Sequence, residues 1–274
     1  MPLQRKLGSL AGEVLLILVS LIIIIPLLIM LLGSFKTSRE ALLFNVSLPA
    51  AWRLDNYQYV IQQGGIWRAM LNSVLIVTAA TGLCLVSAAL CSFIIARKNT
   101  KFSNGLYSLF TLGMIAPMLV VPTIWLMQFL RLSGTYFGVI FLYVAINLPW
   151  SVFIFTGFIK TIPVELDEAA IVDGCGPYRM FFQIIMPLLK PALATNLVIT
   201  AMSIWNDFMI PLYFFNTSEK WTMPLTVYNF FGQYFRDWNY VFADLVLTAL
   251  PVTLLYLYCQ KYIISGMTAG AVKG

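Results

Sequence analysis

Four carboxylates stand close together in this sequence, at Glu165, Asp167, Glu168 and Asp173. Charged residues make up only 10% of the 274-residue chain, so the acidic stretch differs sharply from its surroundings. Clustered acids in proteins serve acid–base catalysis or the docking of a basic partner. The chain has no histidine, which removes the commonest general base and the commonest zinc ligand. Catalysis within this chain is therefore not expected.

The overall composition is that of an integral membrane protein. Hydrophobic residues make up 60% of the chain, aromatic residues 15%, and the mean hydropathy is +0.86. The net charge of +6 comes from short clusters of Lys and Arg between apolar runs, as is typical of loops beside lipid headgroups, so we expect no nucleic-acid partner. The four cysteines have no metal-ligand spacing and indicate no disulfide framework.

Six apolar runs are long enough to cross a bilayer, which takes roughly 20 helical residues. They are Val14–Leu32, Val74–Ala96, Leu106–Leu130, Phe137–Ile159, Ala192–Leu212 and Val241–Ile264. We read the first run as a retained helix, because no small-residue cleavage site follows it. The predicted fold class is therefore all-α, a polytopic membrane protein with six transmembrane helices.

Two longer loops join these spans, and a third, short loop orients them. Residues 33–71 and 215–240 mix aromatic and polar residues and are predicted to be interfacial, the first with a short helix. The short loop after the second span contains Arg97, Lys98 and Lys101 and no acid, so by the positive-inside rule it is cytoplasmic. Both termini and the acidic stretch then lie on the cytoplasmic side.

The acidic stretch is predicted to form two short helices joined at glycines, which we call the elbow (residues 163–187). Pro163 suits a first helical turn, and acids in that turn favour the positive end of the helix dipole, so a helix runs from about Pro163 to Asp173. Gly174 and Gly176 end it, and Pro177 opens a second helix. Apolar residues recur there at helical spacing until Pro187: Tyr178, Phe181, Phe182 and Ile185.

Two interpretations of the elbow are open. Its first arm combines the small residues Ala169 and Ala170 with carboxylates, which suits docking into a basic groove, while the amphipathic second arm anchors it against the membrane helices. The alternative is a solvated loop in which the acids only maintain solubility. Spacing alone does not separate the two.

The stretch EAAIVDGCGPYRMFFQIIMP resembles the Glu-Ala-Ala loop of importer-type ABC transporter permeases. The residues that match the family motif are Glu168, Ala169, Ala170, Asp173, Gly174, Phe181, Ile184 and Pro187. Cys175 stands where the family usually has alanine. The resemblance implies a type I importer permease fold, and it implies that this loop is the coupling helix that seats in a cleft of a cytoplasmic ATPase subunit.

Further stretches narrow the resemblance to the shorter permease subunit of maltose-type carbohydrate importers: NYQYV before RAMLNSVLIV, WNDFMIPL, and the ending QKYIISGMTAGAVKG. It covers the whole chain, 1–274, with a core permease domain at 69–262 and a cytoplasmic coupling loop at 160–191. It implies a bacterial cytoplasmic membrane protein that works with a second permease subunit, two ATPase subunits, an extracytoplasmic solute-binding protein, membrane lipid and a carbohydrate substrate. No cofactor is expected in this chain, and ATP and Mg²⁺ are used by the partner subunits, since no GxxxxGK[ST] loop occurs.

The resemblance also implies a role for the C-terminus. In the best-known relative the permease tail reaches the interface of the ATPase pair, which would place Gly270, Lys273 and Gly274 there. The alternative is a frayed end, as most chain ends are.

Asp207 is an acid deep within the fifth predicted span, roughly 22 Å from its cytoplasmic end. A carboxylate at that depth is costly unless it is paired or wetted. Together with Trp205 and Asn206 it has the chemistry to contact a sugar along a translocation pathway. The alternative, which we favour, is that Asn206 and Asp207 cap or bend the helix before Pro211. Asp244 is most simply interfacial.

Two other functions are alternatives to a permease subunit. An ion-coupled secondary transporter needs its own coupling site, and only Asp207 is deep enough, with no buried Lys or Arg to pair with it. An intramembrane enzyme needs paired acids, metal ligands or a serine beside a base, and the spans have none of these.

Overall fold

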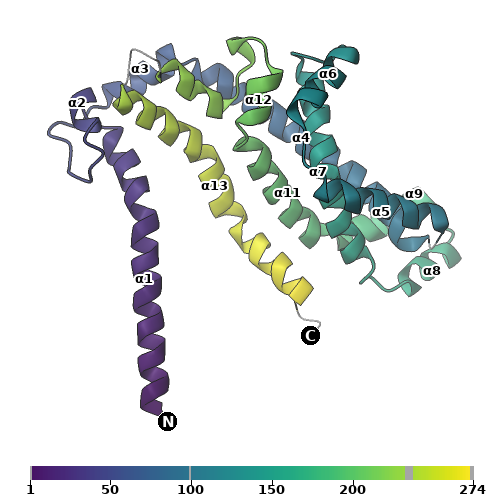
Figure 1. The fold of residues 1–274 in the computed structure, drawn as a ribbon. Coiled ribbons are helices and arrows are strands. Elements are labelled where there is room, and N and C mark those ends of the chain that lie inside the picture. Colours follow the sequence, from purple (N-terminus) through teal and green to yellow (C-terminus); the bar gives the residue numbers. More distant parts are fainter. Residues whose placement is uncertain (1, 99, 232–236, 272–274) are drawn as a thin grey trace. The chain divides into compact units, whose positions relative to one another are not determined.

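The computed structural model describes residues 2–98, 100–231 and 237–271, which are mainly helical and contain no β-strand (Figure 1). This confirms the predicted all-α class. The α-helices are α1 (Pro2–Gly33), α2 (Ser38–Ala41), α3 (Asp55–Gln63), α4 (Ile66–Arg97), α5 (Lys101–Ile115), α6 (Val120–Phe129), α7 (Tyr136–Ile159), α8 (Glu165–Val172), α9 (Pro177–Met180), α10 (Met186–Leu188), α11 (Lys190–Trp205), α12 (Met209–Phe214) and α13 (Trp238–Ala271). A π-helix η1 (Phe181–Ile185) and the 3₁₀ helices η2 (Ser218–Lys220) and η3 (Met223–Asn229) complete the set.

The chain forms two compact units. Unit 1 comprises Met1–Trp67 and Met223–Leu250, and unit 2 comprises Arg68–Thr222 and Pro251–Gly274. Unit 1 therefore holds α1 and most of both predicted interfacial loops, whereas unit 2 holds the elbow and the helices around it.

Among the residues that the structure describes, four helices are long and apolar enough to cross a membrane: Leu15–Gly33, Ile66–Arg97, Tyr136–Ile159 and Trp238–Gln260. They match the first, second, fourth and sixth predicted spans. The second begins at Ile66 rather than Val74, so it takes in part of the predicted loop.

The third and fifth predicted spans are interrupted. The third ends as α5 at Ile115, because Ala116 before Pro117 takes an extended backbone (ψ 119°), and α6 follows as a separate short helix. The fifth stops at Trp205 and resumes as α12. Counting α11 and the bent segment before it as one broken span gives five, so the number six stays a prediction.

In unit 1 a polar network orders the loop that follows α1. The side-chain amide of Asn56, at the start of α3, donates to the carbonyl oxygens of Ser34 (2.8 Å) and Lys36 (2.9 Å). Asn239 in α13 donates to the Asn56 side-chain oxygen at 2.9 Å. The predicted short helix of this loop is confirmed, and both α2 and α3 lie within it. The loop is thus an ordered part of the fold.

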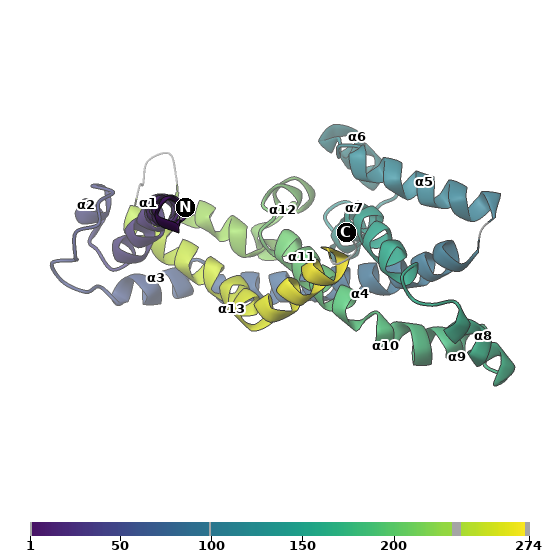
Figure 2. The same ribbon diagram turned by 90° about the horizontal axis from the view of Figure 1, so that it is seen from below.

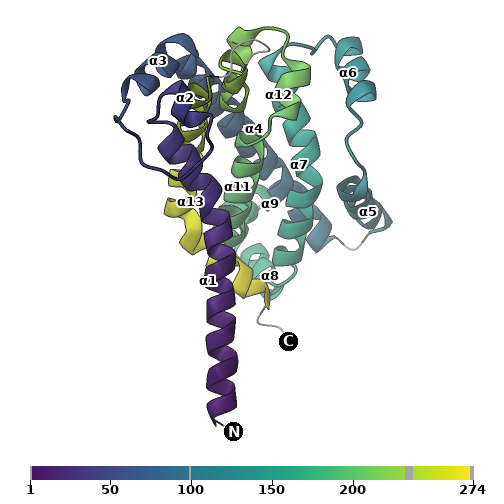
Figure 3. The same ribbon diagram turned by 60° about the vertical axis from the view of Figure 1, so that its left-hand side comes forward.

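In unit 2, α7 lies between α5 and α11 (Figures 1 and 3). Its buried face joins one hydrophobic core with α4 and with the second arm of the elbow. The core residues are Leu85, Ala88, Ala89, Ile95, Val152, Phe155, Ile159, Ile162, Phe181, Ile185, Leu189 and Ala192. Residues of the elbow are therefore part of the core of this unit.

Candidate functional site: the elbow

The first arm of the elbow is α8, and its end is built as the sequence predicts. Its start is not, because α8 begins at Glu165 with Val164 as the N-cap, so Pro163 lies before the helix and not in its first turn. Gly174 has a φ of +75°, a left-handed conformation that glycine adopts without strain. The Cys175 N–H donates to the Ala170 carbonyl at 2.9 Å and the Gly174 N–H to Ile171 at 3.0 Å, which satisfies the last carbonyls of α8. Cysteine in place of the usual alanine is compatible with this turn.

The second arm begins with Pro177 in the first turn of α9 and continues through η1 into α10. The π-helix is marked by the Met186 N–H, which donates to the Phe181 carbonyl five residues earlier. Pro187, the next residue, has no N–H and crowds the carbonyl group four residues before it, so the wider turns precede it. The arm then meets α11 at a bend of 75°, so the elbow extends away from α11 (Figure 2).

The second arm is amphipathic, as predicted. Phe181 and Ile185 are buried, and the Phe181 ring lies 5.5 Å from that of Phe93 in α4. Tyr178 and Phe182 are exposed on the other face. The motif residues Ile184 and Pro187 are half-buried and exposed, respectively. The buried face anchors the elbow on the core of unit 2 and leaves the other face free.

The first arm carries exposed acids. Glu165, Glu168 and Asp173 are exposed, and within the described part of the chain none of them forms an ion pair. The motif residues Ala169 and Gly174 are exposed beside them, whereas Ala170 is buried. Ile171 and Val172 add exposed apolar area. The exposed residues of the first arm are thus acidic, small and apolar.

The fourth acid of the stretch has a different role, which sequence reasoning missed. Asp167 is buried, and its Oδ2 lies 2.7 Å from Nε of Arg97, the last residue of α4. Arg97 was interpreted only as a topology signal. Spacing alone gave no signal for this contact, because the burial of Ala170, which shares a helix face with Asp167, is known only from the structure.

Asp207 is held in a structural role at the break between α11 and α12. Its Oδ1 accepts the Met209 N–H (2.9 Å), and its Oδ2 accepts the Ile210 N–H (3.4 Å). The Tyr143 hydroxyl donates to Oδ2 at 2.9 Å. These contacts begin α12 and tie it to α7, as the capping interpretation expects.

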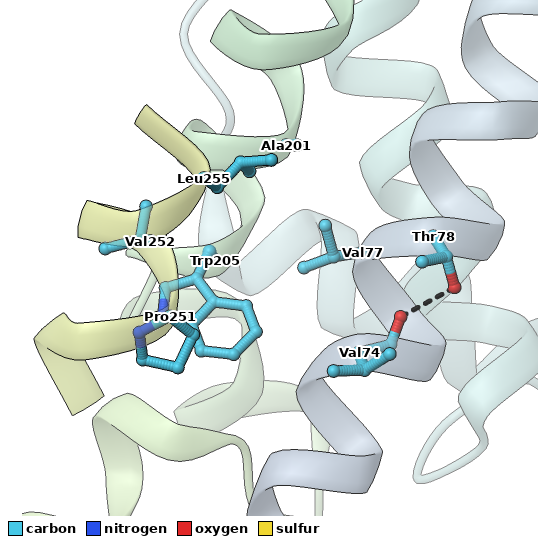
Figure 4. Close-up of a pocket in the computed structure, with 8 residues that line it drawn as sticks. All are labelled: Val74, Val77, Thr78, Ala201, Trp205, Pro251, Val252 and Leu255. Carbon is cyan, nitrogen blue, oxygen red and sulfur yellow. Dashed lines mark hydrogen bonds between the residues drawn. The ribbon is translucent and has the colours of Figure 1, made fainter. Parts of the chain in front are cut away.

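Trp205 and Asn206 do not converge with Asp207. Trp205 is buried and lines an apolar pocket of about 160 Å³ between α4, α11 and α13, while Asn206 is exposed (Figure 4). The other lining residues are Val74, Val77, Thr78, Ala201, Pro251, Val252 and Leu255. Thr78 donates its hydroxyl to the Val74 carbonyl at 2.6 Å, so the pocket offers little free hydrogen-bonding capacity.

The remaining candidate residues are at the C-terminus. Gly270 belongs to the last turns of α13, and Lys273 and Gly274 lie outside the described residues. Within the described part of the chain, no group of three or more Cys, Asp or Glu is arranged to hold a metal ion.

Comparisons with known proteins agree with the resemblance. Residues 88–269 match the family model described as "Binding-protein-dependent transport system inner membrane component". The chain is 36% identical over its full length, and over the full length of the relative, to the multiple sugar-binding transport system permease protein MsmG of Streptococcus mutans. It is 34% identical to the probable starch degradation products transport system permease protein AmyC of Thermoanaerobacterium thermosulfurigenes, with 94% of each chain covered.

A solved structure supports the fold. A chain of a bacterial ABC transporter involved in the import of the acidic polysaccharide alginate superimposes with a TM-score of 0.82 and 20% identity, covering 94% of this chain and 96% of that one. Together with the apolar helices, these matches show a multi-pass membrane permease subunit rather than an enzyme. The chain belongs to the family of binding-protein-dependent transport system inner membrane components.

Proposed function

We propose that this chain is a permease subunit of an ABC importer that carries a sugar or oligosaccharide across the bacterial cytoplasmic membrane. Relatives of which at least 90% is covered have names that refer to multiple sugars, to starch degradation products and to diacetylchitobiose. The observation that carries the coupling part of the proposal is the elbow. Its acidic face is exposed and without an ion-pair partner among the described residues, while its other arm is anchored in the core.

The proposed partners are a second permease subunit, two cytoplasmic ATPase subunits and an extracytoplasmic binding protein. ATP and Mg²⁺ are bound by the ATPase subunits. The motif residues of the first arm, Glu168 to Gly174, seat in an ATPase groove, with Glu168 and Asp173 opposite basic side chains. The motif residues Phe181, Ile184 and Pro187 belong to the arm that connects this contact to the core. Closure of the ATPases moves the elbow and, through it, the membrane helices.

The proposed topology places the elbow and both termini in the cytoplasm. Arg97, in the basic loop that the positive-inside rule assigns to the cytoplasm, contacts Asp167 in the elbow, which supports a common side for the two. Residues 69–262 are the proposed core domain, and residues 160–191 its cytoplasmic coupling loop. The tail from Gly270 to Gly274 is proposed to reach the ATPase pair.

For residues Trp205 to Asp207 we propose support of the translocation pathway rather than direct contact with sugar. The hydrogen bonds of Asp207 are used to start α12. The pocket beside Trp205 is apolar, and its volume of about 160 Å³ leaves no room for an oligosaccharide.

The proposal is tested by purifying the chain from its native membrane and reconstituting the complex that copurifies. We expect a second permease and an ATPase in that complex. With its binding protein, the complex should take up one of a panel of labelled oligosaccharides (maltotriose, raffinose, arabinotriose or diacetylchitobiose) only when ATP is present. Uptake by the isolated chain without an ATPase would overturn the proposal in favour of a secondary transporter.

Glu168→Lys tests the elbow itself. Reversing an exposed charge on the docking face should weaken ATPase copurification and lower uptake at least tenfold without changing the amount of chain in the membrane. Asp55→Lys is the matched control, since Asp55 is an exposed acid in the loop of unit 1. Equal uptake by the two variants would contradict the assignment of the elbow as the coupling element.

A further inference from the structure

Arg97 connects three helix ends within unit 2. Its Nη1 donates to the carbonyl oxygens of Ile159 (3.3 Å) and Ile162 (3.1 Å), at the end of α7 and just beyond it. Its Nη2 donates to Oδ1 of Asp167 at 3.2 Å, and Nε lies 2.7 Å from Oδ2. Nη1 and Nη2 are hydrogen-bonded, and Nε has the ion-pair contact without a hydrogen bond of its own. Together these contacts join the end of α4 to the end of α7 and the first turn of α8.

The contact is nearly closed to solvent. The exposed fractions of the Arg97 and Asp167 side chains are 12% and 10%. The charges also suit the helix ends, because Arg97 lies at the C-terminal ends of α4 and α7 and Asp167 lies in the first turn of α8. A planar guanidinium can reach a carboxylate and two carbonyls at once, which a lysine ammonium cannot do with the same geometry.

The ion pair between Arg97 and Asp167 lies at a groove that side chains leave open. A groove of about 500 Å³ lies between α4 and the elbow, with Phe93 and Ile94 on one side and Ile171 and Tyr178 on the other. Arg97 and Asp167 line the same groove. Next to Asp167 in sequence, Glu168 belongs to the exposed docking face. A displacement of the docking face therefore moves Asp167 directly, and it moves Arg97 through the contact between Arg97 and Asp167.

We propose that Arg97 is a positioning residue for coupling: through Asp167 it makes α8, the end of α7 and the end of α4 move as one body when the elbow is displaced. This inference rests on the proposed function of the elbow. It adds a second connection through which movement of the elbow is transmitted to α4, besides the packing of the buried face of the second arm. A neighbouring contact reinforces the same corner, because the Lys160 ammonium lies 5.2 Å from the centre of the Tyr107 ring and ties the α7–α8 connection to α5.

The test measures the distance between spin labels on α4 and α8 in the reconstituted complex. Leu83 in α4 and Leu166 in α8 are exposed label sites, and Leu166 lies outside the proposed docking segment Glu168 to Gly174. Leu83 lies roughly 21 Å along α4 from Arg97. The four native cysteines are first replaced, in a background that retains uptake. In the otherwise unchanged chain the distance should be the same in the nucleotide-free and the ATP–vanadate-trapped states.

Asp167→Asn is the decisive variant, because it keeps the size of the side chain and a hydrogen-bond acceptor while removing the charge. We expect its label distance to differ between the two states by about 5 Å, one helical turn, and its uptake per ATP hydrolysed to fall at least threefold. Arg97→Lys should show a smaller loss than Arg97→Met. Lys98→Met, which removes the exposed neighbouring charge, is the matched control and should behave as the parent.

Two results would overturn the inference: a label distance that changes between states in the parent chain, or parental distances and parental uptake per ATP in Asp167→Asn. The failure of the proposed function is recognised separately, since it appears as the absence of a copurifying ATPase. In that case the distribution of label distances without nucleotide still tests the contact between Arg97 and Asp167. We expect this distribution to be broader in Arg97→Met than in the parent.

Discussion

The Tyr143 hydroxyl, within α7, donates a hydrogen bond of 2.9 Å to Oδ2 of Asp207, 64 residues later in the chain. The same carboxylate accepts the first N–H groups of α12, so a single acid starts one helix and fastens it to another. Such a partly buried hydrogen bond to a carboxylate contributes about 1.5–3 kcal/mol.

Tyr143→Phe should therefore lower the melting temperature of the purified chain by several degrees, because Asp207 loses a partner while the ring packing is kept. Asp207→Asn should have a smaller effect than Asp207→Ala, since the amide oxygen can still accept an N–H of α12. Thermal unfolding followed by fluorescence in detergent measures these differences. If Asp207→Ala abolished uptake at an unchanged melting temperature, the acid would belong to the pathway instead.

Asp244 and Thr226 form the corresponding pair in unit 1. Asp244 is only 1% exposed, its Oδ1 lies 2.7 Å from the Thr226 hydroxyl, and its Oδ2 has no hydrogen-bond partner among the described residues. The sequence predicts an interfacial depth for this acid, and the structure adds that its side chain is buried within the protein.

Thr226→Val should destabilise the chain by about 1–3 kcal/mol, because it leaves the buried Asp244 without its hydroxyl partner. Thr226→Ser keeps the hydroxyl and should cost about 1 kcal/mol at most, for the lost methyl group. The comparison of the two melting temperatures checks this. Similar values for both variants would show that the hydroxyl contact is not what stabilises Asp244.

Two glycines in the turn of the elbow allow the effect of backbone strain to be distinguished from that of steric crowding. Gly174 has a φ of +75°, whereas Gly176 has a φ of −71°, and a Cβ would meet no atom within 4 Å at either position. Gly174→Ala should therefore destabilise the end of α8 by about 1 kcal/mol through backbone strain alone.

Gly176→Ala is the control and should be close to neutral. Amide hydrogen exchange of residues 165–175 provides the measurement, with faster exchange expected only in Gly174→Ala. Equal exchange in the two variants would mean that the left-handed turn does not limit the stability of α8.

Glu40 is expected to make the loop after α1 sensitive to acid. Hydrogen bonds from the Thr37 N–H and hydroxyl hold the pKa of Glu40 below its ordinary value of 4.5. A carboxyl whose pKa is lowered on folding adds stability above its unfolded pKa, and that stability is lost as the pH falls through the folded pKa. The loop should thus be stable at neutral pH and loosen as the pH falls below the ordinary value of 4.5 and through the lowered pKa of Glu40.

Glu40→Gln should remove this pH dependence, because the amide does not titrate in this range. Fluorescence of Trp52, which packs on Phe35 in the same loop, measures it in a variant in which the other six tryptophans are replaced. Retention of the acid transition in Glu40→Gln would assign it to another group.

The sequence by itself determined that the chain folds in a lipid bilayer, and it determined where the first helix of the elbow ends and where the second begins. Runs of about 20 apolar residues require a bilayer whatever they pack against. Proline at the first turn and glycine after the last turn mark a helix through backbone sterics alone, so Pro177 and Gly174 were interpreted correctly. The match of Glu168, Ala169 and Ala170 to a long motif likewise needed no coordinates.

Only the tertiary structure decided which acids are exposed to a partner and which contact other residues of the same chain. Asp167 and Glu168 are neighbours of the same chemical type, yet one is buried against Arg97 and the other is exposed. Arg97 lies 70 residues before Asp167, and Tyr143 lies 64 residues before Asp207. The desolvation of a buried carboxylate is offset only by specific contacts. Its burial therefore depends on the partners that the fold brings to it from distant segments. The spacing of residues along one helix does not identify these partners.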